Sequence, residues 1–435
     1  MNDFKNNPQT PIHDFLLQYT SKKPVRCHMP GGKENPIDIT EIDGADSLFE
    51  CSGIIRSSEE NAAALFGANK TLYSCGGSTL AIQTMLALAK AYRPEKKRVA
   101  ASRYCHKSLV SACILLDLHI DWIEPASFLS CEVPPKAVED AVASSTLCVF
   151  IQSIDYYGGQ CDISALSQVC KSHNIPLLVD NAHGAYRVFT QNHPLLQGAD
   201  LTADSAHKTL PCLTGGAYLH INKDAPSFFS ERAKEMMSLF GSSSPSYLIL
   251  DSLDLCNRHI FLEKEKAENT MEQIKRLKEN LSNMGAVLRE SDPMRITVDA
   301  EKYGYSGFDL SQALAENNII CEYADQKYTV LLFSTAQPLT DFPKILAAFK
   351  NIPKKTPFET PLPTLSIPKR VMPLTKAVFS PSKEIPLDNA KEKICGAITT
   401  PCPPCVPVIM PGEIFTDKEI SALRMWGVKT VRVLT

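Results

Sequence analysis

The residues that could do chemistry gather in two short runs. In Val179-Asp180-Asn181-Ala182-His183 an acid follows an apolar run, and in Ser205-Ala206-His207-Lys208-Thr209-Leu210 a lysine stands beside a serine and a histidine. This order suits pyridoxal 5'-phosphate (PLP) chemistry, in which a lysine carries the cofactor's aldehyde and an acid keeps the pyridine nitrogen protonated. A buried acid needs a cationic partner, and a pyridinium would supply one. We therefore expect Lys208 to attach PLP and Asp180 to pair with its ring.

Other residues are placed to hold the phosphate and the ring of such a cofactor. The run Gly76-Gly77-Ser78-Thr79 opens a predicted helix, and a helix N-terminus offers free N–H groups and a positive dipole end to an anion. His106 could lie on the pyridine ring or transfer a proton, and His183 is placed to touch the phenolic oxygen or the substrate. Lys208 and His106 are the expected catalytic residues. The residues expected around the cofactor are Gly77, Ser78, Thr79, His106, Asp180, Ala182, His183, Ser205, His207, Lys208 and Ser242.

Each of these residues also has a simpler, structural explanation. Hydroxyl residues at the start of a helix are common N-caps, a lone histidine is more often structural, and an acid at a strand end can cap the next helix. The serine-rich run 241–247 adds hydroxyl groups but also fits an ordinary turn. Lys208 could be a surface lysine, which Ser205 and His207 beside it disfavour. The order and separation of the residues together favour the PLP interpretation.

The elements that must position these residues alternate between strand and helix from about residue 60 to 250. Short apolar runs predict strands at 98–102, 148–152, 176–180 and 216–221. Amphipathic stretches predict helices at 79–92, 106–117 and 162–173, and one long helix near 245–283. This alternation predicts an α/β fold with a mostly parallel sheet, in which ligands bind beyond the carboxyl ends of the strands. Asp180 and Lys208 fall at that edge.

The rest of the chain predicts smaller units. Strands at 295–298 and 328–333, with helices at 307–317 and 341–349, predict a smaller α+β domain. Six prolines between residues 351 and 373 predict an extended linker, and a closing strand is expected at 428–434. The expected organisation is an N-terminal segment with the PLP-binding large domain at 1–255, the small domain at 256–350, the linker at 351–373 and a C-terminal segment at 374–435.

Composition excludes several other classes of protein. The chain of 435 residues is 44% hydrophobic and 21% charged, which is typical of a globular protein with more than one core. A net charge of −3 gives no reason to expect nucleic-acid or membrane partners. No apolar run approaches the roughly 20 residues of a membrane span, and the start lacks a signal-peptide pattern. We therefore expect a cytoplasmic protein whose 15 cysteines stay reduced.

Cys402 and Cys405 stand at a spacing that metal and redox sites use. A structural zinc site wants four ligands, usually from two such pairs, and only Cys395 lies nearby. We therefore expect no metal.

Short motifs follow one another along almost the whole chain: His28-Met-Pro-Gly31, Cys105-His-Lys-Ser108, Asp155-Tyr-Tyr-Gly158, Asp180-Asn-Ala-His-Gly184, Ser205-Ala-His-Lys-Thr-Leu210, Ser244-Pro-Ser-Tyr247, Ser252-Leu-Asp254 and Pro411-Gly-Glu413. In this order they resemble those of the Orn/Lys/Arg decarboxylases, PLP enzymes of the aspartate-aminotransferase fold. The chain is most similar to the short form of Gram-positive bacteria. The resemblance covers both runs from which PLP chemistry is expected.

The resemblance implies roles for particular residues. Lys208 would be the PLP lysine, Asp180 the pyridinium partner and His106 the residue stacked on the ring. The phosphate would be held by Ser78, Thr79, Ser205 and His207, with a hydroxyl of residues 242–244 reaching in from a neighbouring subunit. A homodimer or higher homo-oligomer with shared active sites is therefore implied. Glu322 and Glu413 are similar to family carboxylates near the substrate's distal end, where two anions would suit a guanidinium or ammonium group.

Three segments depart from the family's pattern. The usual Pro-Gly-His-Lys is Pro30-Gly31-Gly32-Lys33, the usual acid after the PLP aspartate is Asn181, and the usual Pro-Tyr-Pro-Pro-Gly is Pro401-Cys-Pro-Pro-Cys405. The cofactor core is intact and the substrate-side loops differ. We expect decarboxylation of a basic amino acid, arginine ahead of lysine and ornithine, to an amine of polyamine metabolism. The alternatives are a PLP lyase or decarboxylase of a non-basic amino acid and a catalytically silent, regulatory homologue.

Overall fold

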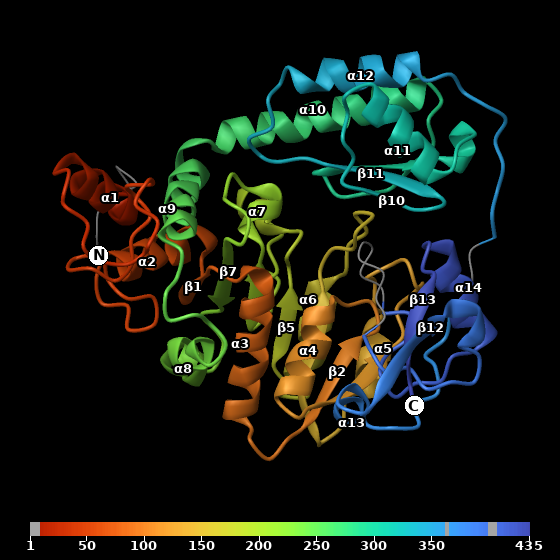
Figure 1. Ribbon diagram of the computed structural model, residues 1–435, viewed down its shortest axis with the longest axis horizontal. Coiled ribbons are helices and arrows are strands. Elements are labelled where there is room, and N and C mark those ends of the chain that lie inside the picture. Colours follow the sequence, from red (N-terminus) through yellow and green to blue (C-terminus); the bar gives the residue numbers. More distant parts are fainter. Residues whose placement is uncertain (1–8, 362–364, 399–406) are drawn as a thin grey trace.

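The computed structural model describes residues 9–361, 365–398 and 407–435. Within these ranges the strands form three sheets, of seven, four and two strands. Each sheet is the centre of one unit, and the units follow one another in chain order (Figure 1). The first and largest unit carries most of the residues expected to bind PLP.

The seven-stranded sheet has the order β1-β7-β6-β5-β4-β2-β3. Neighbouring strands are parallel except at β7, which is antiparallel to both β1 and β6. The prediction of a mostly parallel sheet is confirmed, and the four predicted strands in this region are present. The strands are β1 (Lys70–Ser74), β2 (Arg98–Ser102), β3 (His119–Ile123), β4 (Thr146–Gln152), β5 (Leu177–Asp180), β6 (Leu201–Asp204) and β7 (Ala217–Ile221).

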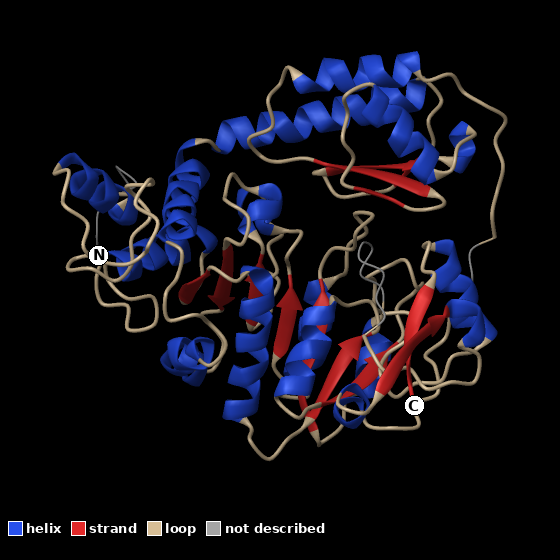
Figure 2. Cartoon of the chain, viewed as in Figure 1, coloured by secondary structure: helices blue, strands red, loops and turns tan. Residues whose placement is uncertain are grey.

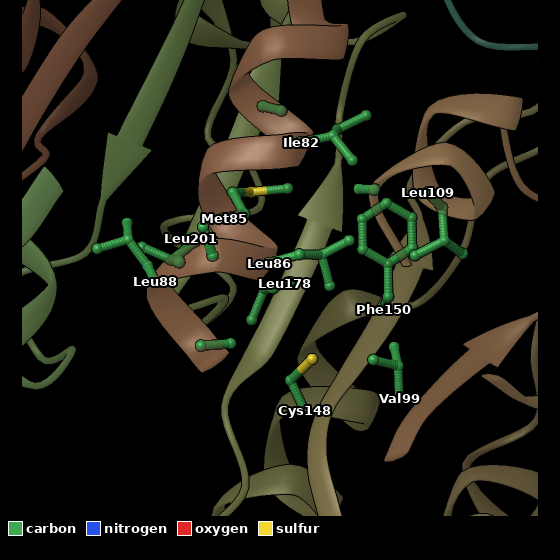
Figure 3. Close-up of a cluster of buried hydrophobic side chains, with 14 of the residues drawn as sticks. Ile82, Met85, Leu86, Leu88, Val99, Leu109, Cys148, Phe150, Leu178 and Leu201 are labelled. Carbon is green, nitrogen blue, oxygen red and sulfur yellow. The ribbon is translucent and has the colours of Figure 1, made fainter. Parts of the chain in front are cut away.

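Helices cover both faces of this sheet because its central strands are apolar on both sides (Figure 2). In β4, Cys148 and Phe150 share a core with α3 and α4, whereas Val149 and Ile151 share another with α5 and α6. Figure 3 shows the first of these cores, where Met85 of α3 lies over the sheet. The helices of this unit are α1 (Pro11–Ser21), α2 (Ile54–Phe66), α3 (Gly77–Tyr92), α4 (Lys107–Leu115), α5 (Pro135–Ala141), α6 (Ile163–Ser172), η1 (Ala185–Phe189), α7 (Ala206–Thr209), α8 (Ser227–Ser238) and α9 (Tyr247–Leu262).

The carboxyl ends of the parallel strands meet at one edge of the sheet. Strands β1, β2, β4, β5 and β6 end there, and the antiparallel strand β7 begins there at Ala217. Ser78 follows β1, His106 follows β2, Asp180 ends β5 and Lys208 follows β6. The alternation of strand and helix therefore gathers residues from distant parts of the sequence at a single edge.

The small unit is a four-stranded antiparallel sheet with helices on one face. The sheet has the order β10-β11-β9-β8. Its helices lie on the side away from the large unit, toward which the other face of the sheet is turned (Figure 2). The predicted α+β elements of this region are confirmed. They are α10 (Lys264–Asn283), β8 (Leu288–Arg289), β9 (Arg295–Asp299), η2 (Glu301–Tyr303), α11 (Gly307–Glu316), β10 (Tyr323–Ala324), β11 (Tyr328–Leu332) and α12 (Asp341–Asn351).

The single long helix predicted near 245–283 is wrong, because the chain forms two helices, α9 and α10. They are separated at Glu263, whose φ of −110° and ψ of 26° are not helical. Leu250 and Leu253 of α9 pack into the core of the large unit. Ile274 and Leu277 of α10 pack into the core of the small unit. A straight helix could not turn both apolar stripes toward cores that lie in different directions, so the chain bends between them.

The C-terminal unit is built on β12 and β13, and the closing strand predicted at 428–434 is confirmed as β13. Residues 353–361 and 365–373 lead to it from the small unit, and their single bridge joins Arg370 to Glu413. Cys402 and Cys405 lie outside the described residues. Of the described helices, none is long and apolar enough to cross a membrane. The elements of this unit are α13 (Leu374–Val378), β12 (Ser382–Pro386), η3 (Leu387–Asn389), α14 (Asp417–Met425) and β13 (Thr430–Leu434).

Candidate active site

Lys208 lies on α7, a single helical turn that follows β6. Backbone bonds hold this turn at the sheet edge: His207 N–H donates to Gly216 O (3.3 Å), and Thr335 N–H donates to Thr209 O (2.9 Å). The Lys208 Nζ lies 3.0 Å from Nε2 of His183, which follows β5. The structure thus brings the two runs singled out in the sequence into direct contact.

Asp180 is the last residue of β5 and lies between Gln152 of β4 and Ala203 of β6. Its side chain is buried, and Oδ1 accepts a hydrogen bond from Ala182 N–H (3.0 Å). Burial raises the pKa of this carboxyl, against the opposing effects of His106 and Lys208. Among the described residues no cationic side chain forms an ion pair with it. A protonated pyridine nitrogen would complete this environment.

His106 is the N-cap of α4, beside the Asp180 carboxylate. Its Nδ1 accepts from Ser108 N–H (3.2 Å) and lies 2.8 Å from Ser108 Oγ. Because Nδ1 accepts a backbone hydrogen bond, the ring hydrogen is on Nε2. These bonds hold the ring at the helix start, close enough to interact with both Asp180 and His183.

The first turn of α3 fits an anion. Gly77 has a φ of +65°, a conformation that favours glycine, and a Cβ there would meet open space. Gly77 N–H donates to Gly215 O (2.8 Å), which ties this turn to the start of β7. His207 is bound to the neighbouring residue through Nδ1 and Gly216 O (3.0 Å). Two segments therefore lie side by side at the start of β7: the first turn of α3 and the turn that bears Lys208. They include Ser78, Thr79 and the buried Ser205.

Ser242 lies in the exposed turn before α9. Together with Gly76 and Thr79 it lines a cavity of about 280 Å³. Its hydroxyl donates weakly to Ser244 O (3.4 Å). Within one chain, Ser242 therefore lies near the N-terminus of α3, across a shared cavity lining.

The two expected substrate carboxylates have different surroundings. Glu322 is half-buried beside β10, where burial raises its pKa and the nearby charges of Lys208 and Arg295 oppose this. Glu413 is fully buried, and Arg103 binds both of its oxygens, at 2.9 Å and 2.7 Å. Met410 N–H also donates to it (2.8 Å). Glu322 therefore lies near Lys208. Glu413 instead binds Arg103, which follows β2, and so links the C-terminal unit to the large unit.

Breaking this buried ion pair should destabilise the protein. In a Glu413→Gln variant the Arg103 guanidinium stays buried without a counter-charge, so we expect the apparent free energy of unfolding to fall by about 3–5 kcal/mol. Urea unfolding followed by circular dichroism measures the change. The exposed Glu384→Gln is the matched control, and the double variant Arg103→Met, Glu413→Met should recover most of the loss. A stability unchanged by Glu413→Gln alone would show that the pair contributes nothing.

Arg295 is a residue of the site that sequence reasoning missed. It is buried at the start of β9, and its Nη2 lies 2.5 Å from His183 Nδ1, while its Nη1 forms an ion pair with Asp292. Tyr156 was also missed, and its ring lies 4.8 Å from the His183 ring. Two signals were available in the sequence, the charged first residue of the predicted strand 295–298 and the place of Tyr156 in the motif Asp155-Tyr-Tyr-Gly158.

The loop after β4 brings the small unit onto this site. Gly158 has a φ of +92°, and a Cβ there would lie 2.6 Å from Ser291 Cβ and 2.9 Å from Asp292 Oδ2. Thr297 Oγ1 donates to Tyr157 O (2.7 Å). The glycine therefore allows the close approach that places Arg295 beside His183.

A buried polar network lies behind the end of β5. Asn181 Nδ2 donates to Asp204 Oδ2 (2.8 Å), and Asn181 Oδ1 accepts from Ser153 Oγ (2.7 Å). His193 Nε2 lies 2.9 Å from the same Asp204 oxygen. Burial alone would raise the pKa of Asp204, but the His193 and Asn181 contacts outweigh burial and lower it. Asp204 of the next strand thus supplies a carboxylate beside position 181, where the family's usual acid is replaced.

Relatives of known sequence cover almost the whole chain. The family model of the Orn/Lys/Arg decarboxylase major domain matches residues 18–298, and that of the C-terminal domain of the same family matches residues 367–427. The protein YaaO of Bacillus subtilis, described as uncharacterized, is 28% identical over 97% of this chain and 95% of its own. The arginine decarboxylase of the same organism is 26% identical over 95% of this chain and 92% of its own.

Solved structures share the architecture. The constitutive lysine decarboxylase of Escherichia coli has a TM-score of 0.76 and 17% identity, covering 100% of this chain and 83% of that one. A lysine decarboxylase of Francisella novicida has a TM-score of 0.78 and 15% identity, covering 100% and 82%. The fold is that of the fold type I PLP-dependent enzymes, as predicted. With the major-domain model matching more than half of the sequence, this chain belongs to the Orn/Lys/Arg decarboxylase family.

Proposed function

We propose that this protein is a PLP-dependent decarboxylase that converts a basic amino acid, arginine before lysine or ornithine, into the corresponding amine and CO2. The observation that carries the proposal is the contact between Lys208 and His183 beside the buried Asp180, at the carboxyl edge of the large sheet. Family membership supports the reaction type. The amine formed would be agmatine, cadaverine or putrescine, for use in polyamine metabolism.

The residues of the site fit PLP in type and position. Lys208 would carry the aldehyde carbon, Asp180 would pair with the ring nitrogen and His106 would lie against the ring. The phosphate would be held by the first turn of α3 and by the turn that bears Lys208, with these residues: Gly77, Ser78, Thr79, Ser205 and His207. When bound, PLP supplies an electron sink for the pair left behind by the departing carboxylate.

The chain itself controls protons and water. Lys208 Nζ and the His106 ring are the two groups placed to hold the proton that the product carbon requires. His183, Arg295 and Asp180 are buried around the half-buried Lys208 and His106, so the inner side of the site holds little water. Fixed charges act more strongly in such a site than in solvent. The negative charge of Asp180 then favours a protonated ring nitrogen throughout the reaction.

Glu322 is the residue proposed to select a basic side chain. Among the described residues, Glu322 has no ion-pair partner. Burial raises its pKa, so a cationic partner would stabilise its charged form. A substrate guanidinium would satisfy both carboxylate oxygens with two parallel hydrogen bonds. Arginine decarboxylases of three further Bacillaceae match this chain at 25–26% identity over 95–96% of its length, which favours arginine. Since Glu413 is bound to Arg103, we assign the distal contact to Glu322 alone.

The active site is proposed to be shared in a homodimer or higher homo-oligomer. Ser242 is exposed at the cavity beside Thr79, so its hydroxyl is accessible to a second copy of the chain. Sedimentation of the PLP-loaded protein gives the assembly state.

A substrate panel tests the function. Purified protein with added PLP should release CO2 and amine from arginine, more slowly from lysine and ornithine, and from no acidic or aromatic amino acid. Mass spectrometry identifies the amine. A Glu322→Gln variant should raise the KM for arginine by about 10–100-fold, because a charge-assisted hydrogen bond contributes about 1.5–3 kcal/mol.

The outcomes of the panel are distinguishable. Exposed Glu316, on α11 of the same unit, provides the matched control Glu316→Gln, which should leave KM unchanged. Decarboxylation of non-basic amino acids alone would refute the substrate assignment. Attachment of PLP with no product from any amino acid would point to the catalytically silent homologue.

A further inference from the structure

Three buried side chains, Asp292, Arg295 and His183, form a line from the small unit to the half-buried Lys208. The Asp292 carboxylate forms an ion pair with Nη1 of Arg295, and Nη2 of Arg295 lies 2.5 Å from His183 Nδ1. On the other side of the imidazole, His183 Nε2 lies 3.0 Å from Lys208 Nζ. Exposed fractions are 0% for Asp292, 1% for Arg295 and 4% for His183. Water can therefore contribute little to the hydrogen bonding of the imidazole.

Hydrogen-bond chemistry fixes the direction of this line. A guanidinium has five N–H donors and no acceptor, so His183 Nδ1 must accept from Arg295. A neutral imidazole with an accepting Nδ1 carries its hydrogen on Nε2, which then donates toward Lys208 Nζ. Nζ can accept that hydrogen bond only as a neutral amine, because an ammonium group has no lone pair. If Lys208 were protonated, both Lys208 and Arg295 would be donors. A neutral imidazole has only one accepting nitrogen, so it could not accept from both.

We infer that Arg295 is a positioning residue that fixes His183 as the Nε2–H tautomer and thereby holds Lys208 as the neutral amine that attaches PLP. This inference rests on the proposed function. Only a neutral amine attacks an aldehyde, and attachment forms a C=N bond as the two amine hydrogens leave with the aldehyde oxygen as water. Arg295, which reaches Lys208 only through His183, would thus set the rate at which PLP attaches to the protein.

The electrostatics of the site agree with a neutral imidazole. His183 is faced by Arg295 from β9, Lys208 and His207 from α7, and His106 from the start of α4. Burial lowers the pKa of His183 far below its ordinary value, and the positive charge of Arg295 lowers it further. The pair of Arg295 with Asp292 keeps the guanidinium charged, so its donor role does not change with pH.

The tautomer can be measured on the full chain purified without PLP. In protein carrying ¹⁵N-labelled histidine, two-bond ¹H–¹⁵N correlations distinguish the tautomers, and the signal missing in a His183→Gln variant assigns the residue. At neutral pH we expect a neutral ring with hydrogen on Nε2. Hydrogen on Nδ1, or a doubly protonated ring, would overturn the inference whatever reaction the enzyme catalyses.

Loading with PLP gives a second readout that does not depend on turnover. Borohydride reduction at timed intervals, followed by the mass of the peptide containing Lys208, gives the rate of attachment. Arg295→Gln should slow it by about 10–100-fold, because the amide oxygen of glutamine can turn toward His183 and reverse the tautomer. Arg295→Lys keeps a pure donor and should retain most of the rate. The exposed Arg276→Gln, on α10, is the control for handling.

Loss of the Arg295 charge leaves Asp292 unpaired. The double variant Arg295→Gln, Asp292→Asn removes both charges and keeps the test available if the single variant does not fold. Unchanged loading and an unchanged tautomer, with only a higher substrate KM, would show that Arg295 binds the substrate's carboxylate instead. If the unaltered protein never attaches PLP, the proposed function fails, and the tautomer measurement still stands by itself.

Discussion

Replacing Lys208 with alanine should abolish both PLP attachment and amine formation. The side chain at this position is the proposed carrier of the cofactor and one of the two groups placed to return a proton to the product carbon, so its loss removes two roles at once. We expect kcat to fall by on the order of 10⁴ or more. The measurement combines amine formation from arginine with the absorbance of the protein after PLP is added and the excess removed.

A matched lysine and a trapped peptide make this test specific. Lys223→Ala, an exposed lysine after β7, should leave both loading and turnover unchanged. Borohydride treatment of the unaltered protein should add the mass of reduced PLP to the peptide that contains Lys208. An unmodified peptide, or normal product formation by Lys208→Ala, would contradict the central assignment.

Replacing Asp180 with asparagine should separate binding of the cofactor from its activation. The amide fills nearly the same buried space but carries no negative charge, so a protonated ring nitrogen would lose its counter-ion and the electron sink would weaken. We expect kcat to fall by about 10³-fold while PLP still attaches to Lys208. Steady-state kinetics give the loss in kcat, and the mass of the borohydride-reduced peptide shows attachment.

Asp200 offers the matched control for this substitution. It is another largely buried acid whose pKa burial raises, but it lies at the opposite end of β5, where it accepts a hydrogen bond from Leu177 N–H (2.8 Å). Asp200→Asn should affect stability far more than kcat. Equal losses of kcat in both variants would mean that Asp180 acts only by supporting the sheet.

The two strongest assignments share one structural cause. Asp180 ends β5, and Lys208 lies on α7, the helical turn that follows the adjacent parallel strand β6, so strand separation contributes directly to their spacing. Rigid elements on both sides hold such residues more accurately than a mobile loop would. The large unit therefore supplies most of the proposed cofactor site, and the small unit adds Arg295 and Glu322 beside it.

The sequence by itself determined the cofactor side of this protein. Asp180 ends a short apolar strand, His106 follows another, and Lys208 lies in the next run along the chain. Because strand ends of a parallel sheet meet at one edge, this order was enough to predict that the three residues would converge. The strands of the large sheet that were missed by pattern, β1, β3 and β6, mix polar with apolar residues. In β1, for example, the buried Thr71 hydroxyl pairs with His220 of β7 (2.8 Å).

Only the tertiary structure decided which charged groups are available for chemistry. Arg103 and Glu413 pair across 310 positions, and Arg295 meets His183 across 112. The break between α9 and α10 at Glu263 likewise depends on two cores that face different directions. Local periodicity reports which face of an element is apolar, but the partner of a buried charge is chosen by packing between distant elements, and no pattern within one element records it.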